Sequence, residues 1–259
     1  MTNTYYRTRL LIDMTIRIAT RYTLALIIGI SLVLIAVVPA EEEGVFLKVR
    51  ELRVKPQKNH RLAQNAIVCN VTDQNSNDYG NIGTKLPSNV TYRINPSSTP
   101  SSLSSNLNTI VSNSFNVWDT ATNGVTFTKG SNTSTSRARF DGQNIIAWGR
   151  LSSSTLGATY IWYSTSTGQV REVDTIMNSR KSWSWTNPAS VDEDQTCSSP
   201  NAYDAQNILV HELGHWVGLA DLYNTSHEDL TMYGYGQLGE LKKDTLESGD
   251  QLGAGTIYP

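Results

Sequence analysis

The chain has 259 residues, and 39% of them are hydrophobic, including six tryptophans and twelve tyrosines. This is the composition of a folded domain with a sizeable core rather than of a disordered chain. The formal net charge is −2 at pH 7. Without the first 40 residues, 17 basic and 22 acidic side chains remain, so the net charge becomes −5. An acidic domain is not expected to bind nucleic acid, because that affinity depends on basic side chains.

The first 40 residues predict a targeting segment. Residues 23–40 carry no charge, are rich in Leu, Ile and Val, and follow four arginines. Such a run, ending in the small residues of Val38-Pro39-Ala40, is typical of a signal peptide, with translation starting at Met1 or Met14. The alternative is an uncleaved anchor, because an apolar run of this length can just span a bilayer. Both interpretations place the rest of the chain outside the cytoplasm, either secreted or held at the membrane.

Residues 41–81 predict a short propeptide or a linker. They begin with three glutamates, continue through a basic stretch at 48–61, and end in Asn, Ser, Asp and Gly with little periodicity. A solvated charged segment without an inhibitory role is the other open interpretation. One globular domain then remains, at residues 82–259.

The domain is expected to begin with a strand and a helix. Residues 90–95 alternate between polar and apolar side chains and stop at Pro96, which cannot continue a strand ladder. Residues 101–122 carry apolar side chains at steps of three and four, which predicts a helix packed on a sheet and capped by Ser101 or Ser102. The apolar positions are Leu103, Leu107, Ile110, Val111, Phe115 and Trp118.

Four further strands are expected at residues 125–128, 144–148, 158–163 and 170–177. With residues 90–95 they predict a twisted five-stranded sheet. The short connection at 164–168 suits a hairpin, so residues 158–163 are expected to run antiparallel at the edge of the sheet. An extended peptide could add to that edge by main-chain hydrogen bonds. The alternative is that Ile161 and Tyr163 only pack.

The segment His211-Glu212-Leu213-Gly214-His215 indicates metal chemistry. On a helix beginning near Ala205, the two histidines lie four residues apart, so both imidazoles project from one face toward a single ion. Glu212 lies beside the first histidine, where its carboxylate can deprotonate a metal-bound water. Three of the four histidines of the chain fall within 17 residues here, which disfavours a chance occurrence of this spacing.

The third ligand is expected to be Asp221. Gly218 permits a tight exit from the helix, which turns the chain back so that Asp221 can approach the ion from another side. His227, six residues further on, is the rival ligand. Three protein ligands leave one open position, as in catalytic zinc sites.

Met232, in the context Leu-Thr-Met-Tyr-Gly, completes a pattern that resembles the metzincins, zinc peptidases whose zinc motif is followed by a turn with a methionine beneath the metal. Asp221 in place of a third histidine resembles the snapalysin type. The strands and the Met232-Tyr233 pair resemble matrixin catalytic domains of a bacterial or archaeal kind. Over residues 82–259 the resemblance implies an α+β domain with a mixed five-stranded sheet, a backing helix, an active-site helix and a C-terminal helix at 245–258.

The resemblance implies a secreted zinc endopeptidase acting on protein or peptide substrates. His211, His215 and Asp221 would hold Zn²⁺, and Glu212 would be the general base. Tyr233 or Tyr235 could donate to the oxyanion, as a tyrosine near this turn does in the astacin branch, or could simply pack. A monomer is expected, with membrane contact only if the N-terminal segment is retained. The alternative is a catalytically silent binding module of the same fold, against which the intact Glu212 argues.

The chain departs from animal matrixins in two respects. It has no histidine between Arg61 and Val210, so their structural zinc site should be absent, and their cysteine-switch sequence is missing. Cys69 and Cys197 could form a disulfide in an exported protein, or Cys69 could bind zinc as a thiolate in a latent form. Residues 141–144 and 171–174 offer oxygen ligands near turns, either for Ca²⁺, which such domains often bind, or merely as polar turns, because no EF-hand spacing is present.

Overall fold

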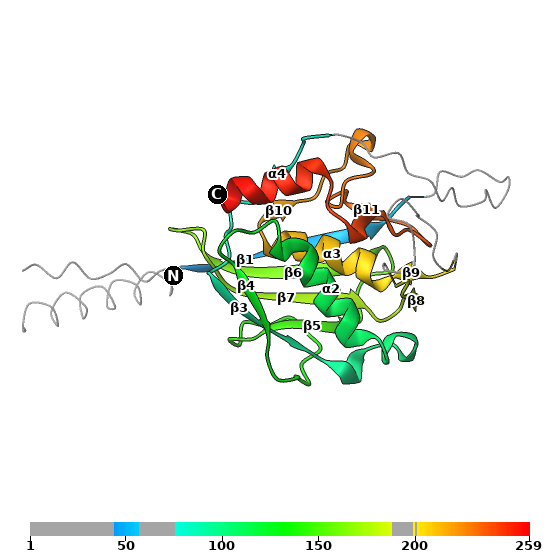
Figure 1. Ribbon diagram of the computed structural model, residues 1–259. Coiled ribbons are helices and arrows are strands. Elements are labelled where there is room, and N and C mark those ends of the chain that lie inside the picture. Colours follow the sequence, from blue (N-terminus) through cyan, green and yellow to red (C-terminus); the bar gives the residue numbers. More distant parts are fainter. Residues whose placement is uncertain (1–43, 57–75, 188–198, 200) are drawn as a thin grey trace, which may run out of the picture. The chain divides into compact units, whose positions relative to one another are not determined.

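The computed structural model describes residues 44–56, 76–187, 199 and 201–259, all within one compact unit, Glu42–Pro259 (Figure 1). The predicted targeting segment and both cysteines, with their proposed disulfide, fall outside the described residues. Of the helices in the described part of the chain, none combines the length and the apolar character needed to cross a bilayer.

The main sheet has seven strands in the order β11-β1-β6-β7-β5-β3-β4. Five of them correspond to the predicted strands: β3 (Asn89–Ile94), β4 (Thr126–Lys129), β5 (Asn144–Gly149), β6 (Thr155–Ser164) and β7 (Val170–Asn178). β3 is parallel to β4 and β5, β5 is parallel to β7, and β6 is antiparallel to β7. The mixed α+β sheet is confirmed, with two strands more than predicted.

The additional strands are β1 (Val45–Val54) and β11 (Tyr235–Gly236). β1 runs antiparallel beside β6 from Val45 to Arg53 and parallel beside β11 at Arg53 and Val54. The prediction that residues 158–163 form the edge of the sheet is therefore wrong, because β1 covers them. β1 was not predicted because its alternation of apolar and polar residues changes phase at Glu51 and is interrupted by the apolar run at residues 45–47. Only one of its ten residues, Leu52, is buried.

Two helices, α2 (Leu107–Asp119) and α3 (Ala205–Trp216), pack against each other on the sheet (Figure 1). The predicted apolar stripe of the first helix is buried throughout. The α-helix starts later than expected, because residues 101–103 form a separate 3-10 turn and Asn106 precedes α2. The Trp118 indole N–H donates to the Val210 carbonyl at 2.8 Å, and Phe115 meets Trp216 edge-on at 5.4 Å. These contacts fix α3 against α2.

α3 begins at Ala205, as predicted, because Asp204 caps it. The Asp204 carboxylate accepts from the backbone N–H of Gln206 at 3.0 Å and of Asn207 at 3.1 Å, which satisfies two free donors of the first turn. The predicted C-terminal helix is α4 (Ser248–Ile257). The remaining short elements are β2 (Gly80–Asn81), η1 (Pro96–Ser98), η2 (Ser101–Leu103), β8 (Trp183–Ser184), β9 (Tyr203–Asp204), β10 (Leu219–Ala220), η4 (Thr225–His227) and η5 (Lys242–Asp244).

Candidate active site and metal centre

His211 and His215 project from one face of α3 with their ring centroids 4.9 Å apart, and both are fully buried. Each ring places its Nδ1 against a backbone carbonyl, 2.7 Å from Thr231 O for His211 and 2.8 Å from Leu219 O for His215. A carbonyl can only accept, so Nδ1 carries the proton in each neutral ring. Both Nε2 atoms are therefore left with a lone pair, in the orientation of metal-binding histidines.

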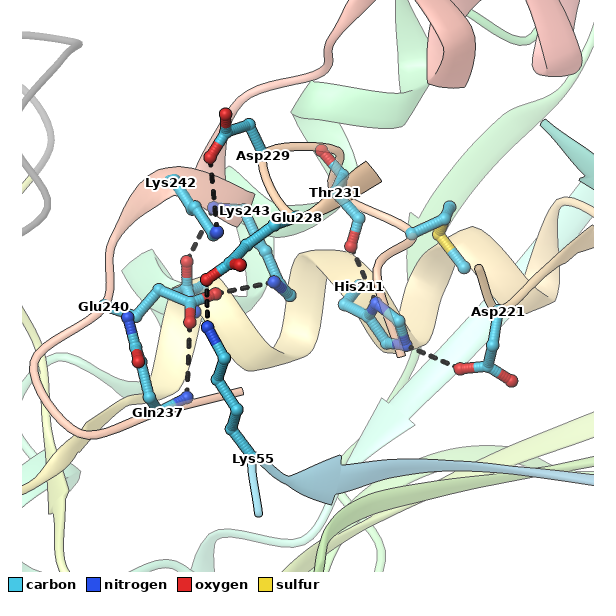
Figure 2. A network of polar contacts seen from close by, with 12 residues as sticks. Lys55, His211, Asp221, Glu228, Asp229, Thr231, Gln237, Glu240, Lys242 and Lys243 are labelled. Atoms are coloured by element: carbon cyan, nitrogen blue, oxygen red, sulfur yellow. Dashed lines mark hydrogen bonds and ion pairs between the residues drawn. The ribbon is translucent and has the colours of Figure 1, made fainter. Parts of the chain in front are cut away.

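Asp221 reaches the two histidines from the loop after β10. Its Oδ1 lies 3.3 Å from His211 Nε2 and 3.5 Å from His215 Nε2, and Figure 2 shows it at the ring edge of His211 opposite Thr231. None of these three buried atoms has a hydrogen-bond partner among the described residues. Three lone pairs that face one another repel unless a cation lies between them. The residues therefore fit a metal ion, and two imidazole nitrogens with one carboxylate oxygen suit zinc.

The charges of these groups depend on one another. Burial lowers the pKa of His211. Burial acts in the same direction on His215, but the Asp221 carboxylate outweighs it and the pKa of His215 is raised. For Asp221, burial would raise the pKa, but the electrostatic attraction of His215 and His211, whose Nε2 atoms lie close to its carboxylate, outweighs burial and holds the pKa below the usual range. Asp221 is thus kept ionised, as a metal ligand must be.

The turn from α3 to Asp221 requires glycine at position 218. Gly218 has φ of 101°, and a Cβ there would lie 2.3 Å from the Thr84 carbonyl oxygen. The predicted tight exit is present. His227, the rival ligand, instead places its Nε2 2.8 Å from the Asp78 carboxylate. The structure brings Asp221, and not His227, to the histidine pair.

Glu212 is fully buried and is held by a chain of hydrogen bonds. The Trp216 indole N–H donates to Thr175 Oγ1 at 2.8 Å, the Thr175 and Thr159 hydroxyls are 2.8 Å apart, and Thr159 donates to Glu212 Oε2 at 2.6 Å. Glu212 Oε1 has no partner of full hydrogen-bond geometry among the described residues. One carboxyl oxygen is therefore fixed while the other can exchange a proton.

Residues of β6 and β1 surround the same carboxyl group. A Cβ on Gly157 would lie 2.4 Å from Glu212 Oε1, so only glycine leaves room for it. The backbone N–H of Leu52, in β1, also lies close enough to the carboxyl group to act on its pKa. Burial raises the pKa of Glu212 to about 7, although the charge of His215, the Thr159 hydroxyl and the Leu52 N–H lower it. A carboxyl group that titrates near neutrality suits general acid–base chemistry.

Met232 lies against α3 at Gly214, where a Cβ would be 2.2 Å from its Sδ. Asp250 of α4 holds this turn, accepting from the N–H of Thr231 at 2.9 Å and of Met232 at 3.2 Å. Because the Thr231 carbonyl accepts from His211, α4 supports a candidate ligand. Sequence reasoning gave α4 no role in the site. The only signal in the sequence was the acidic residue at the third position of α4, which forms a capping box with Glu247.

No described contact brings Tyr233 or Tyr235 to the ligands. The Tyr233 ring lies 5.6 Å from the Lys243 ammonium, and the Tyr235 ring meets the Tyr233 ring at 5.6 Å. Tyr223, which sequence reasoning missed, lies close enough to Asp221 for the aspartate charge to act on its pKa. Its pKa is raised to about 12, first by burial and then by the negative charge of Asp221.

The carboxylates considered as calcium ligands instead accept hydrogen bonds from backbone N–H groups. Glu172 accepts from the N–H of Asp141 at 2.9 Å and also from Gly142, and Asp174 accepts from Arg139 and Ile145, each at 3.0 Å. Over the described ranges, His211, His215 and Asp221 form the only cluster of three potential ligands close enough to share an ion. Nothing in the described structure supports calcium at these turns, and the polar-turn interpretation accounts for these contacts.

The matrixin family model matches residues 84–259. The match includes α3, the loop to Asp221 and the turn at Met232. A comparison with curated proteins gives no match. Because the family model covers more than half of the chain, the protein belongs to the matrixin family of metallopeptidases.

Proposed function

We propose that the protein is a zinc-dependent endopeptidase that hydrolyses protein or peptide substrates outside the cytoplasm. The observation that carries the proposal is the convergence of three unpartnered atoms, from His211, His215 and Asp221, beside the carboxyl group of Glu212. Membership of a metallopeptidase family supports the chemistry. The uncharged residues 23–40, which follow four arginines, support export.

Each group has a distinct task in hydrolysis. His211, His215 and Asp221 would hold zinc, which would supply Lewis acidity for the scissile carbonyl and would lower the pKa of a water molecule toward about 7. Glu212 accepts the proton of the attacking water and returns it to the nitrogen of the leaving amine. Because Thr159 occupies Oε2, the unpartnered Oε1 is the oxygen that exchanges this proton. No covalent intermediate with the enzyme is needed.

The test is casein hydrolysis by the full chain reconstituted with zinc, compared with Glu212→Gln. We expect equal zinc content in both proteins and hydrolysis by the parent alone, because the glutamine amide keeps the shape of the side chain but cannot accept a proton. If the parent and the Leu52→Arg variant both bind zinc and neither hydrolyses casein, the result would instead support a silent binding module.

A further inference from the structure

β1 lies between β6 and β11, directly at the candidate catalytic carboxyl group. Leu52 pairs with Gly157, the residue whose missing Cβ makes room for Glu212. The Leu52 N–H lies close enough to the carboxyl group of Glu212 to lower its pKa, and the side chain of Glu212 is fully buried. A peptide from solvent therefore cannot reach Glu212 while β1 is in place.

The side chain of Leu52 fills an apolar pocket built from three elements. Around the position that a Cβ on Gly236 would take, Leu156 Cδ1 of β6 lies at 2.8 Å, Ile208 Cδ1 of α3 at 3.1 Å and Leu52 Cδ2 at 3.7 Å. Leu52 is 0% exposed, whereas Leu47, in the same strand, is 49% exposed. Leu52 is thus the side chain that anchors β1.

Polar contacts fix the register of β1 on both sides of Leu52. Before it, the Lys48 ammonium donates to the Ile82 carbonyl at 2.5 Å. After it, the Arg53 N–H donates to the Gly234 carbonyl at 3.2 Å, and the Lys55 side chain forms an ion pair with Glu228 (Figure 2). The strand therefore presents one defined peptide bond to Glu212.

We propose that β1 is bound as the enzyme's own first substrate and that the chain hydrolyses its Glu51–Leu52 bond. This inference rests on the proposed peptidase function. A general base that returns its proton to the leaving amine must lie beside the nitrogen of the scissile bond. Leu52 is paired with Gly157, and Glu212 Oε1 lies 2.4 Å from the place of a Cβ on Gly157, so the nitrogen beside Glu212 is that of Leu52. The bond that breaks joins this nitrogen to the carbonyl carbon of Glu51.

The reaction consumes one water molecule. Its hydroxyl adds to the carbonyl carbon of Glu51, and its proton passes through Glu212 to the nitrogen of Leu52 as the bond breaks. The products are a carboxylate on Glu51 and a free amine on Leu52. Residues 45–51 are then separated from the anchoring leucine and keep their pairing with β6 and the contact of Lys48 with the Ile82 carbonyl, so they can leave once these contacts open. Until this cleavage, β1 excludes other peptides from Glu212.

The first experiment follows the zinc-reconstituted full chain by intact mass and N-terminal sequencing. We expect a fragment that begins at Leu52, formed at a rate independent of protein concentration because the strand and the site belong to one chain. Glu212→Gln should remain whole. Leu52→Arg should lose this cleavage at least tenfold, because an unpaired charge does not fit the apolar pocket. Leu47→Arg, in the exposed part of the strand, is the matched control and should be cut like the parent.

The second experiment needs no catalysis. In the Glu212→Gln background, a fluorescent peptide with the sequence of residues 45–56 is titrated into the full chain and its anisotropy is measured. Leu52→Arg should bind this peptide at least tenfold more tightly than either the parent or Leu47→Arg. Leu52→Ala, which only shortens the side chain, should have an intermediate effect, and it serves if Leu52→Arg does not fold.

An intact parent chain, a fragment that begins elsewhere, or equal peptide binding by parent and Leu52→Arg overturns the proposal. Casein hydrolysis separates this failure from that of the proposed function. If Leu52→Arg hydrolyses casein but the parent never yields the Leu52 fragment, the peptidase function stands and self-cleavage is wrong. If neither protein hydrolyses casein or itself, the peptidase function fails, and peptide binding alone decides whether β1 closes the site.

Discussion

Glu212 keeps its position because the strand facing it carries no side chain at residue 157. The carboxyl group lies in the space where a Cβ on Gly157 would be, while Thr159, two residues along β6, donates to its other oxygen. In an extended strand, residues two apart point to the same face. One strand thus both makes room for the proposed base and orients it.

Gly157→Ala is expected to lower peptide hydrolysis about 100-fold without loss of zinc. The new Cβ would lie 2.4 Å from Glu212 Oε1 and 2.9 Å from both Cδ and Cγ, so the carboxyl group must move, and a displacement of about 1 Å can have an effect of this size. Casein hydrolysis and zinc content are the measurements. Gly255→Ala in α4, where a Cβ meets nothing within 4 Å, is the control. Activity within about twofold of the parent would contradict this role for Gly157.

At the scale of elements, the sequence predicts what local periodicity encodes. α2 follows from its apolar stripe, α3 from the histidine spacing, and the strands β3 to β7 from short apolar runs between turn residues. The start of α2 was misplaced because residues 101–103 form their own turn.

The elements that escaped prediction are those whose partners lie far away in the sequence. β1 has a single buried side chain and pairs with β6 more than 100 residues later, so its own sequence does not show that it enters the site. The role of Asp250 follows only from its hydrogen bonds with the backbone of Thr231 and Met232. The periodicity of α4 does not reveal these distant partners. The turn to Asp221 was predictable, because Gly218 must adopt a positive φ.

Asp250→Ala is expected to weaken zinc binding about tenfold, since changes in the groups that orient metal ligands commonly have effects of 10–100-fold. The variant leaves the N–H groups of Thr231 and Met232 without their acceptor, which should also lower the free energy of unfolding by about 1–3 kcal/mol. Competition with a chromogenic chelator measures the first quantity and urea unfolding the second. Leu252→Ala, half exposed on the same helix, should change neither. Lower stability with normal zinc affinity would limit α4 to a structural role.

At the scale of the whole domain, the segment after the active-site loop contains a buried ion pair and is bonded to α3 by the backbone of Lys243. Lys243 Nζ lies 2.6 Å from Glu240, and the Lys243 N–H donates to Asn207 Oδ1 at 2.6 Å; Figure 2 shows the pair beside the Lys55–Glu228 contact. Burial alone would raise the pKa of Glu240, but the charge of Lys243 outweighs it and the pKa is lowered. The contribution of Glu240 to stability is therefore present above its ordinary pKa of 4.5 and is lost as pH falls through the lowered value.

Lys243→Met is expected to lower the free energy of unfolding at pH 7 by about 3–5 kcal/mol, because it leaves the Glu240 carboxylate buried and unpaired. In this variant the pKa of Glu240 rises above 4.5, so the sign of its linkage reverses and the deficit shrinks as pH falls from 7 toward 5. Urea unfolding at both pH values measures this. Lys242→Met, which breaks a contact of 3.5 Å to Asp229, is the neighbouring control and should have a smaller effect. A deficit of equal size at both pH values would contradict the assignment.

Zinc should stabilise the fold as a whole, because its proposed ligands come from α3 and from the loop that follows β10. An ion that binds only the folded state at a free concentration 100 times its Kd adds about 2.7 kcal/mol. For a domain of this size, that corresponds to a rise in Tm of about 5–10 °C. The Glu212→Gln chain, which cannot cut itself, is the protein to melt with zinc and with a chelator.

The same melting experiment identifies the third ligand. Asp221→Ala in the Glu212→Gln background should lose most of the zinc-dependent rise in Tm, because two histidines alone hold the ion weakly and the open coordination position cannot replace a carboxylate. His227→Ala should keep it, since the His227 ring is bound to Asp78 rather than to the histidine pair. The two variants are matched, as each removes one potential ligand from the same loop. If His227→Ala abolished the zinc-dependent rise in Tm while Asp221→Ala preserved it, the third ligand would be His227, and the loop would change its conformation when zinc binds.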